Sequence, residues 1–191
     1  MLDTINLLGR SFEEFMSLFF CEVVDDDDYY DVIAYHLAKN HRPQLEGMLH
    51  LLSPKRLRAA IFGIGLLRST GSDEVLRTYL DHSDPLVVSA ALDALRGTGT
   101  VEWEHVSRFL TDTSPFVRGA ALRLAKARLG TNALPLLLAA LKDSAAIVKQ
   151  NALDELDGIA DKSHLAPISL LLQDPSAHVR QAAKTLIEAI G

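Results

Sequence analysis

Residues 114–122 read Ser-Pro-Phe-Val-Arg-Gly-Ala-Ala-Leu, and this phrase recurs along the chain. Close copies occupy residues 53–61 and 84–92, and looser copies lie at residues 148–153 and 179–184. The second alanine falls at Ala60, Ala91, Ala121, Ala152 and Ala183, so the copies are 30 or 31 residues apart. Self-similarity at a fixed period is typical of a solenoid, in which each unit covers the apolar face of its neighbour. The sequence therefore predicts stacked copies of one small unit.

Each repeat divides into two segments of helical length. The second segment, called B, begins at Ser53, Asp84 or Ser114, and a proline follows each of these residues. Their side chains are expected to accept hydrogen bonds from free N–H groups of the first turn, where proline has no N–H to leave unpaired. The preceding segments, called A, have helical apolar spacing, and each is expected to form one helix. The A segments span residues 43–52, 72–81, 101–111, 131–142 and 162–173.

Two stretches resemble the HEAT repeat, in the short form that is also seen in phycobilisome-lyase-type HEAT proteins. Residues 134–143, with Val148-Lys149 in the helix that follows, are the best match to one whole repeat, and residues 114–122 match its second helix. The resemblance covers residues 43–191. It implies an all-α fold, a right-handed α-α superhelix of about five helical hairpins.

One position of the HEAT pattern differs between the two halves of the chain. The family's basic residue after the valine is present as Arg118, Lys149 and Arg180, but Leu57 and Val88 replace it in the first two repeats. A ladder of aspartate and arginine side chains between repeats is therefore expected only in the C-terminal half.

The repeats are expected to form one continuous domain behind an N-terminal helical cap at residues 1–42. The five repeats span residues 43–70, 71–99, 100–130, 131–160 and 161–191. In the last repeat, Lys184 replaces the core residue of the earlier copies, which is Ile61, Leu92, Leu122 or Leu153. A charge at this position predicts that the last repeat faces water there.

The N-terminal region carries a pattern of its own. Ser11 and Glu14 form a capping-box pattern, and an aromatic-rich stripe follows at helical spacing. The stripe consists of Phe12, Phe15, Met16, Phe19, Phe20 and Val23. An acidic run at residues 25–28 then leads into a second helix. One interpretation is a cap that covers the first repeat, with the acids at the positive end of the next helix. The alternative is an acidic docking element with Tyr29 and Tyr30 at its edge.

Composition excludes several classes of partner. The formal net charge is −6, of which residues 1–50 contribute −7 and the remainder +1, so no basic stripe is available to replace phosphate counterions. We therefore expect no nucleic-acid binding. No apolar run is long enough for a membrane span, and the chain starts without the pattern of a secretory signal. Cys21 is the only cysteine, which suits a cytoplasmic protein. A monomer is expected, with a homodimer through the N-terminal helix as the alternative.

We identify no catalytic, cofactor-binding or metal-binding residues. The seven histidines form no HExxH motif and no i, i+4 pair beside an acid, so a zinc site has no support. HEAT-like hydroxylases that act on modified lysine carry repeated His-Glu dipeptides as iron ligands, and this chain has no His-Glu. HEAT-like DNA glycosylases use a basic groove with aromatic residues, whereas Trp103 is the only tryptophan here and falls on an A segment. Cys21 has no basic neighbour in the sequence to lower its pKa, and it is expected to be inert.

The resemblance places a partner on the B helices, which line the concave face of HEAT arrays. The outward positions hold Arg58, Phe62, Leu86, Ser89, Asp93, Phe116, Gly119, Arg123, Ile147, Gln150, Asp154, His178, Gln181 and Thr185. Four of these are large and apolar, and they either bind a partner or fill gaps between B helices. This mixed surface suggests a protein or peptide ligand. A non-catalytic scaffold or adaptor is therefore the preferred function. The alternatives are an inhibitor or immunity-type binding protein and, by analogy of fold alone, an enzyme or enzyme subunit of the bilin-lyase class.

Overall fold

The computed structural model describes residues 7, 9–21, 27–98 and 101–191. Within these ranges every regular element is a helix, and no strand is present. The fold is an all-α solenoid of the predicted class. The chain divides into two compact units, residues 1–100 (unit 1) and residues 101–191 (unit 2). Each unit is described by itself.

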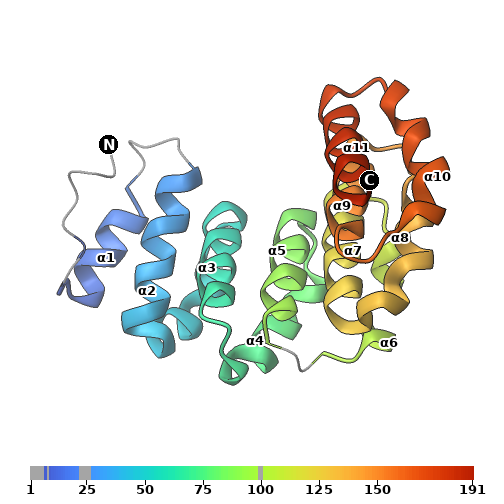
Figure 1. The fold of residues 1–191 in the computed structure, drawn as a ribbon. Coiled ribbons are helices and arrows are strands. Elements are labelled where there is room, and N and C mark those ends of the chain that lie inside the picture. Colours follow the sequence, from blue (N-terminus) through green and yellow to red (C-terminus); the bar gives the residue numbers. More distant parts are fainter. Residues whose placement is uncertain (1–6, 8, 22–26, 99–100) are drawn as a thin grey trace. The chain divides into compact units, whose positions relative to one another are not determined.

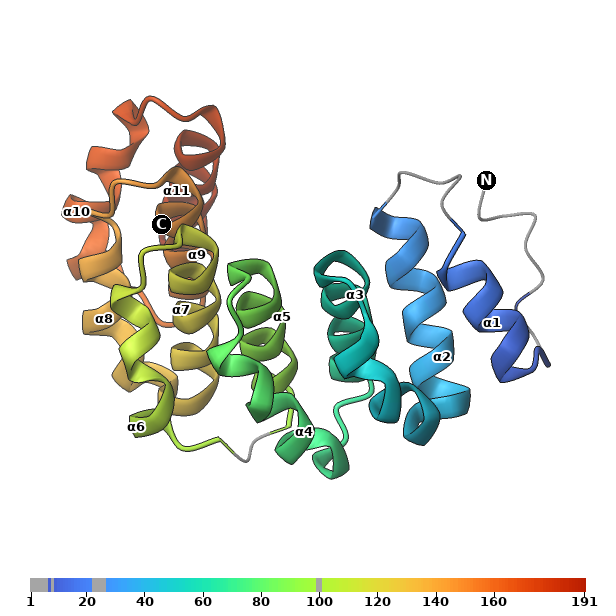
Figure 2. The same ribbon diagram turned by 180° about the vertical axis from the view of Figure 1, so that it is seen from behind.

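Unit 1 is built on a row of long helices, which Figures 1 and 2 show side by side. The short α1 (Phe12–Phe19) precedes α2 (Asp27–Met48), and α3 (Pro54–Leu66) and α5 (Pro85–Arg96) continue the row. The helix α2 is kinked at His41, where φ is −139° and ψ is 35°. The kink lies next to the predicted end of the cap at residue 42. The shorter elements of unit 1 are η2 (Leu49–Leu51), η3 (Thr70–Ser72), α4 (Asp73–Arg77) and η4 (Thr78–Asp81).

Unit 2 has two layers (Figures 1 and 2). One layer is formed by the B helices α7 (Pro115–Leu129), α9 (Ala146–Leu156) and α11 (Ala177–Ile190). The other layer is formed by the A segments, which are broken into short pieces. These are α6 (Trp103–Val106), η5 (Ser107–Thr111), η6 (Gly130–Ala133), α8 (Leu134–Ala140), η7 (Lys162–His164), α10 (Leu165–Ser169) and η8 (Leu170–Gln173).

The A segments correct one prediction. Each was expected to be a single helix, but from the second repeat onward each one combines a short α-helix with 3₁₀ turns. Val106 shows the change locally, because it ends α6 and directly precedes η5. Apolar spacing does not separate the two helix types over so few residues, since both place every third or fourth side chain inward. The predicted positions of these segments are nevertheless correct.

The starts of the B helices correct a second prediction. Ser53, Asp84 and Ser114 do precede α3, α5 and α7, and a proline occupies the first turn of each helix. Only Asp84 accepts a side-chain cap bond, from the Leu86 N–H at 2.8 Å. At Ser114 the backbone N–H instead donates to the Asp112 carboxylate at 2.8 Å. Asp112, two residues before the N-cap, therefore orders this loop.

Part of the N-terminal aromatic stripe is buried inside unit 1: Phe15, Met16 and Phe19 are buried, Phe12 is half-buried, and Phe20 is 44% exposed. Phe15 and Phe19 have no exposed surface, and the predicted capping box forms, with Ser11 N–H to Glu14 Oε2 at 2.7 Å and Glu14 N–H to Ser11 Oγ at 3.2 Å. Arg56 of α3 donates from Nε to the Phe19 carbonyl at 2.9 Å. This contact joins the end of α1 to α3. The three buried residues of the stripe therefore pack as a cap would, whereas Phe20 does not, and Val23 lies outside the described residues.

The alternative of a docking element is wrong for the two tyrosines. Tyr29 and Tyr30 are each only 4% exposed. Their hydroxyls donate to the carbonyls of Leu18 at 3.3 Å and Cys21 at 2.8 Å. They tie α2 to the preceding segment because a buried phenol needs an acceptor. Asp25 and Asp26 lie outside the described residues, and the oligomeric state stays a prediction.

The paired alanines lie in the core, as the repeat pattern predicts. Ala60, Ala91, Ala121, Ala152 and Ala183 are all fully buried. The extent of the cap and the five repeat boundaries stay predictions. Lys184 is exposed on α11, as expected, and its side chain lies 3.9 Å from Glu188.

Candidate partner-binding surface

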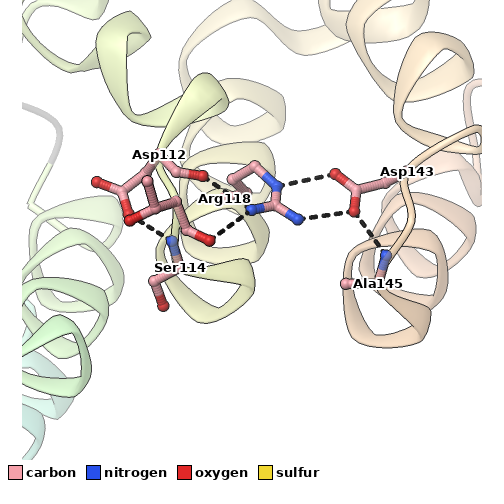
Figure 3. A network of polar contacts seen from close by, with 6 residues as sticks. Asp112, Ser114, Arg118, Asp143 and Ala145 are labelled. Carbon is pink, nitrogen blue, oxygen red and sulfur yellow. Dashed lines mark hydrogen bonds and ion pairs between the residues drawn. The ribbon is translucent and has the colours of Figure 1, made fainter.

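A charged ladder fixes the loops that precede the B helices of unit 2 (Figure 3). Arg118 of α7 donates from Nε and Nη2 to the two carboxylate oxygens of Asp143, both at 2.8 Å. Its Nη1 donates to the carbonyls of Asp112 at 2.8 Å and Thr113 at 3.1 Å. Asp143 also accepts the Ala145 N–H at 2.8 Å. One guanidinium thus joins the loop of its own repeat to the loop of the next repeat.

The ladder repeats once more along unit 2. Lys149 of α9 bonds Asp174, and Asp174 in turn accepts the Ser176 N–H at 2.9 Å. Hydrogen bonds from these bases hold the pKa of Asp143 and that of Asp174 below the usual value for aspartate, because they favour the ionised form. The ladder predicted for the C-terminal half is present.

In unit 1 the corresponding residues, Leu57 and Val88, are buried in the core. A different pair forms there, between Arg58 of α3 and Asp31 of α2, with Nη2 and Oδ1 2.8 Å apart. Burial raises the pKa of Asp31, an effect that the charge of Arg58 opposes. Arg58, predicted as a partner anchor, is therefore engaged within its own unit.

The predicted site residues are divided between the two units. Unit 1 holds Arg58, Phe62, Leu86, Ser89 and Asp93, and unit 2 holds Phe116, Arg123, Ile147, Gln150, Asp154, His178 and Gln181. Phe62 and Leu86 are 38% and 45% exposed, so part of each side chain remains accessible to a partner. Ser89 and Asp93 of α5 are half-buried.

In unit 2 two large apolar side chains are exposed at the same repeat position, each immediately before the buried valine of its B helix. Phe116 is 50% exposed and Ile147 is 37% exposed. His178 occupies this position on α11 and is also exposed. Gly119, which the sequence placed on the outward side, is instead buried, because the side chain of Asn151 from the next repeat packs over it.

Five of the residues that the sequence analysis placed on the outward side line one groove between α9 and α11. They are Gln150, Asp154, His178, Gln181 and Thr185, and the groove has a volume of about 460 Å³. Leu153, Ala182 and Leu186 are apolar lining residues, while Asp157 adds a polar group. Their role in binding stays a prediction.

Asp157 is the lining residue that the sequence analysis missed. It follows Leu156, the last residue of α9, and its backbone is no longer helical. Helical spacing gives no direction to a side chain beyond the end of its helix. A second carboxylate therefore joins Asp154, whose pKa is raised by partial burial and lowered to a smaller extent by the charge of Arg123.

A smaller cavity of about 300 Å³ lies beside the ladder in unit 2. Arg118 and Asp143 form part of its wall, together with apolar side chains from the A segments such as Leu110 and Leu136. Arg118 and Asp143 already bond each other, and Lys142 is a further charged residue of the lining.

Searches of the described residues gave no metal-binding cluster and no helix able to cross a membrane. No three His, Cys, Asp or Glu side chains come together there in an arrangement that could hold an ion. None of the helices in those ranges is both long and apolar enough to span a bilayer.

Comparison with known proteins supports the repeat assignment. The family model of the HEAT repeat associated with sister chromatid cohesion matches residues 104–125, which cover the end of one A segment and the start of α7. The chain is a HEAT-like repeat protein. No curated protein matches the chain.

Solved structures of low sequence identity share the repeat fold. An engineered protein is 18% identical with a TM-score of 0.54, and the alignment covers 95% of this chain and 96% of that protein. This likeness shows the fold alone. Human deoxyhypusine hydroxylase with glycerol is 16% identical with a TM-score of 0.45, covering 92% of this chain and 84% of the enzyme. A designed armadillo repeat protein in complex with the peptide (KR)4 is 14% identical with a TM-score of 0.49, covering 95% and 100%. The similarity to the hydroxylase and to the designed armadillo protein says nothing about the activity or ligand of this chain.

Proposed function

We propose that the chain is a non-catalytic protein-binding module whose partner lies on the B helices. The observation that carries the proposal is the pair of exposed apolar side chains, Phe116 and Ile147, at the same position of successive repeats in unit 2. Single exposed apolar side chains are common, but exposed apolar side chains at the same position of neighbouring repeats favour an interaction surface. Their equivalence along the array gives a partner two anchors on neighbouring helices.

The adjoining groove supplies the polar part of such an interface. The carboxamides of Gln150 and Gln181 and the carboxylates of Asp154 and Asp157 line this groove together with apolar side chains. Its volume of about 460 Å³ is suited to a few side chains of a peptide segment. An apolar centre with a polar rim is the usual composition of protein interfaces.

The charges of the groove favour a polypeptide over a polyanion. Two carboxylates line it, and His178 is the only other titratable lining residue. Phosphate groups would meet repulsion here, since a nucleic-acid interface requires a surplus of lysine and arginine. In unit 1, the exposed Phe62 and Leu86 offer a smaller apolar surface of the same kind.

A matched pair of substitutions tests the proposal. Phe116→Glu places a charge on the B-helix surface, whereas Leu170→Glu places the same charge on the A layer of unit 2, where Leu170 is 76% exposed. Partners are captured from extracts of the native cell on immobilised wild-type chain and on each variant, and are quantified by mass spectrometry. We expect the recovery of a specific partner to fall about tenfold or more with Phe116→Glu, as for a hot-spot residue, and to be retained with Leu170→Glu. Equal recovery on both variants, or loss on Leu170→Glu alone, would refute the proposal.

A further inference from the structure

Arg180 on α11 is the third member of the series that contains Arg118 and Lys149. Its Nη1 donates to the carbonyls of Asp174 at 2.7 Å and Pro175 at 2.9 Å. These acceptors lie six and five residues earlier in the chain, as Asp112 and Thr113 do for Arg118. The two guanidinium groups are therefore held by the loops of their own repeats in the same way.

The difference lies in the other two nitrogens. In Arg118, Nε and Nη2 form a fork that binds both oxygens of Asp143. In Arg180 the same two nitrogens meet no hydrogen-bond acceptor among the described residues, and the side chain is exposed. At Arg118 this fork binds a carboxylate. At Arg180 the corresponding fork carries no carboxylate among the described residues.

The neighbouring side chains make this face of α11 both basic and apolar. Lys184 is the counterpart of Leu153, and Ile187 is the counterpart of Leu156. Leu153 and Leu156 are buried in the core of unit 2, whereas Lys184 is exposed and Ile187 is half-buried. Lys184 lies 3.9 Å from Glu188, so a ligand on this face would meet the Arg180 guanidinium beside that ion pair and the apolar side chain of Ile187.

We propose that this face, defined by Arg180, Lys184 and Ile187, binds a partner protein through an aspartate in the loop that precedes a helix. Such an aspartate presents both oxygens to the Arg180 fork while one of them accepts the N–H two residues further on. Asp143, in the loop before α9, makes both kinds of contact within this chain. A bidentate arginine–carboxylate pair requires this planar match.

The two carbonyl bonds to Arg180 strengthen the proposal. An arginine side chain loses conformational freedom when it binds, and this loss weakens most exposed ion pairs. At Arg180 the bonds to the carbonyls of Asp174 and Pro175 already restrict the side chain in the absence of a ligand, so the fork is preorganised. This site is separate from the groove between α9 and α11, and it stands if the groove binds nothing.

The chain's own segment 143–156 provides the probe, because Arg118 binds its first residue in the structure. The full chain is titrated with a capped synthetic peptide of this sequence, and the arginine Nε–H resonances are followed by ¹H–¹⁵N NMR. The Arg180 resonance is assigned by its loss in Arg180→Gln. We expect the Arg180 resonance to shift, while that of Arg118, already bonded to Asp143, stays in place.

Fluorescence anisotropy with the labelled peptide supplies the matched controls. We expect Arg180→Gln to weaken binding about tenfold, which is the loss typical of a charge-assisted hydrogen bond. Lys162→Gln removes the same charge from an exposed residue of η7 and should change affinity less than about twofold. A peptide with Asp143→Asn should bind as weakly as the arginine variant does. The proposal fails if the Arg180 resonance does not respond at millimolar peptide, or if the two protein variants bind the peptide equally.

Discussion

The two units hold neighbouring helices together by different means. In unit 1, glycines let helices approach closely: a Cβ on Gly63 would lie 2.5 Å from the Ala34 carbonyl carbon, and one on Gly65 would lie 2.6 Å from Ala94 Cα. In unit 2, charged side chains reach from one repeat to the loop of the next, as Arg118 does to Asp143. The ladder follows from one position of the repeat, which is apolar in unit 1 (Leu57, Val88) and basic in unit 2, while the close approach in unit 1 depends on glycines at other positions. A single repeat pattern therefore tolerates two solutions to the same packing problem.

Gly63→Ala should give the largest effect, because the new methyl group meets backbone atoms of α2 that cannot move aside. We expect the free energy of unfolding to fall by about 3 kcal/mol, at the upper end for overpacking. Chemical denaturation followed by circular dichroism measures it. Gly119→Ala is the control in unit 2, where the methyl group meets only the flexible amide of Asn151. There the cost should be close to zero, since alanine gains about 1 kcal/mol of helix propensity. Equal losses in both variants would remove the distinction between the units.

Arg118→Gln tests the ladder itself. It removes both bonds to Asp143 and leaves that carboxylate without its cation, so we expect a loss of about 2 kcal/mol. Arg58→Gln in unit 1 breaks a pair of the same length whose side chains are about one fifth exposed, and the loss should be about 1 kcal/mol or less. Urea denaturation of both variants provides the comparison. A larger loss for Arg58→Gln would show that unit 1 depends on ion pairs more than unit 2 does.

A smaller change in stability is expected from substitutions at the residues that precede the B helices. Asp84→Ala removes a cap bond in unit 1, and about 1 kcal/mol of stability should be lost. Ser114→Ala in unit 2 removes a hydroxyl that makes no cap bond, and stability should change by less than about 0.5 kcal/mol. Thermal denaturation distinguishes the two. A cost for Ser114→Ala equal to that of Asp84→Ala would contradict the role given to Asp112.

Asp143 in unit 2 and Asp31 in unit 1 should have opposite effects on how the free energy of unfolding changes with pH. The pKa of Asp143 is lowered in the folded state, so its contribution to stability is complete above the unfolded value of 3.8 and is lost as pH falls through the folded value. The pKa of Asp31 is raised, so its protonation favours folding as pH falls through its folded value. Free energies of unfolding measured from about pH 5 to about pH 2 should therefore decline less steeply in Asp143→Asn than in the wild type. In Asp31→Asn the decline should be steeper, and changes of the same sign in both variants would contradict these assignments.

The sequence predicted the parts of the fold that depend on repetition. The all-α class, the positions of the B helices, the buried alanines and the ladder all follow from residues that recur at a fixed spacing. Features set by local geometry were not predictable in this way. The change from α-helix to 3₁₀ helix after Val106 and the hydrogen bond that Asp112 accepts in the loop depend on individual hydrogen bonds. Apolar spacing gives no information about these bonds.

The candidate surface was predicted in part, for the same physical reason. Helical spacing placed Gln150, Asp154, His178, Gln181 and Thr185 on the outward side, and all five line one groove. It missed Asp157 beyond the end of α9. Contacts between helices that are adjacent in space but distant in sequence were also beyond its reach. Such contacts bury Gly119 under Asn151 and tie Arg58 to Asp31.

Site-specific photo-crosslinking tests the central claim most directly. A photoreactive amino acid is placed at residue 147 on the exposed B-helix surface or at residue 170 on the A layer of the same unit, and both chains are irradiated in the native cell. We predict a discrete adduct with a partner protein from residue 147 and none from residue 170. An adduct from residue 170 alone would contradict the assignment of the B helices as the binding surface.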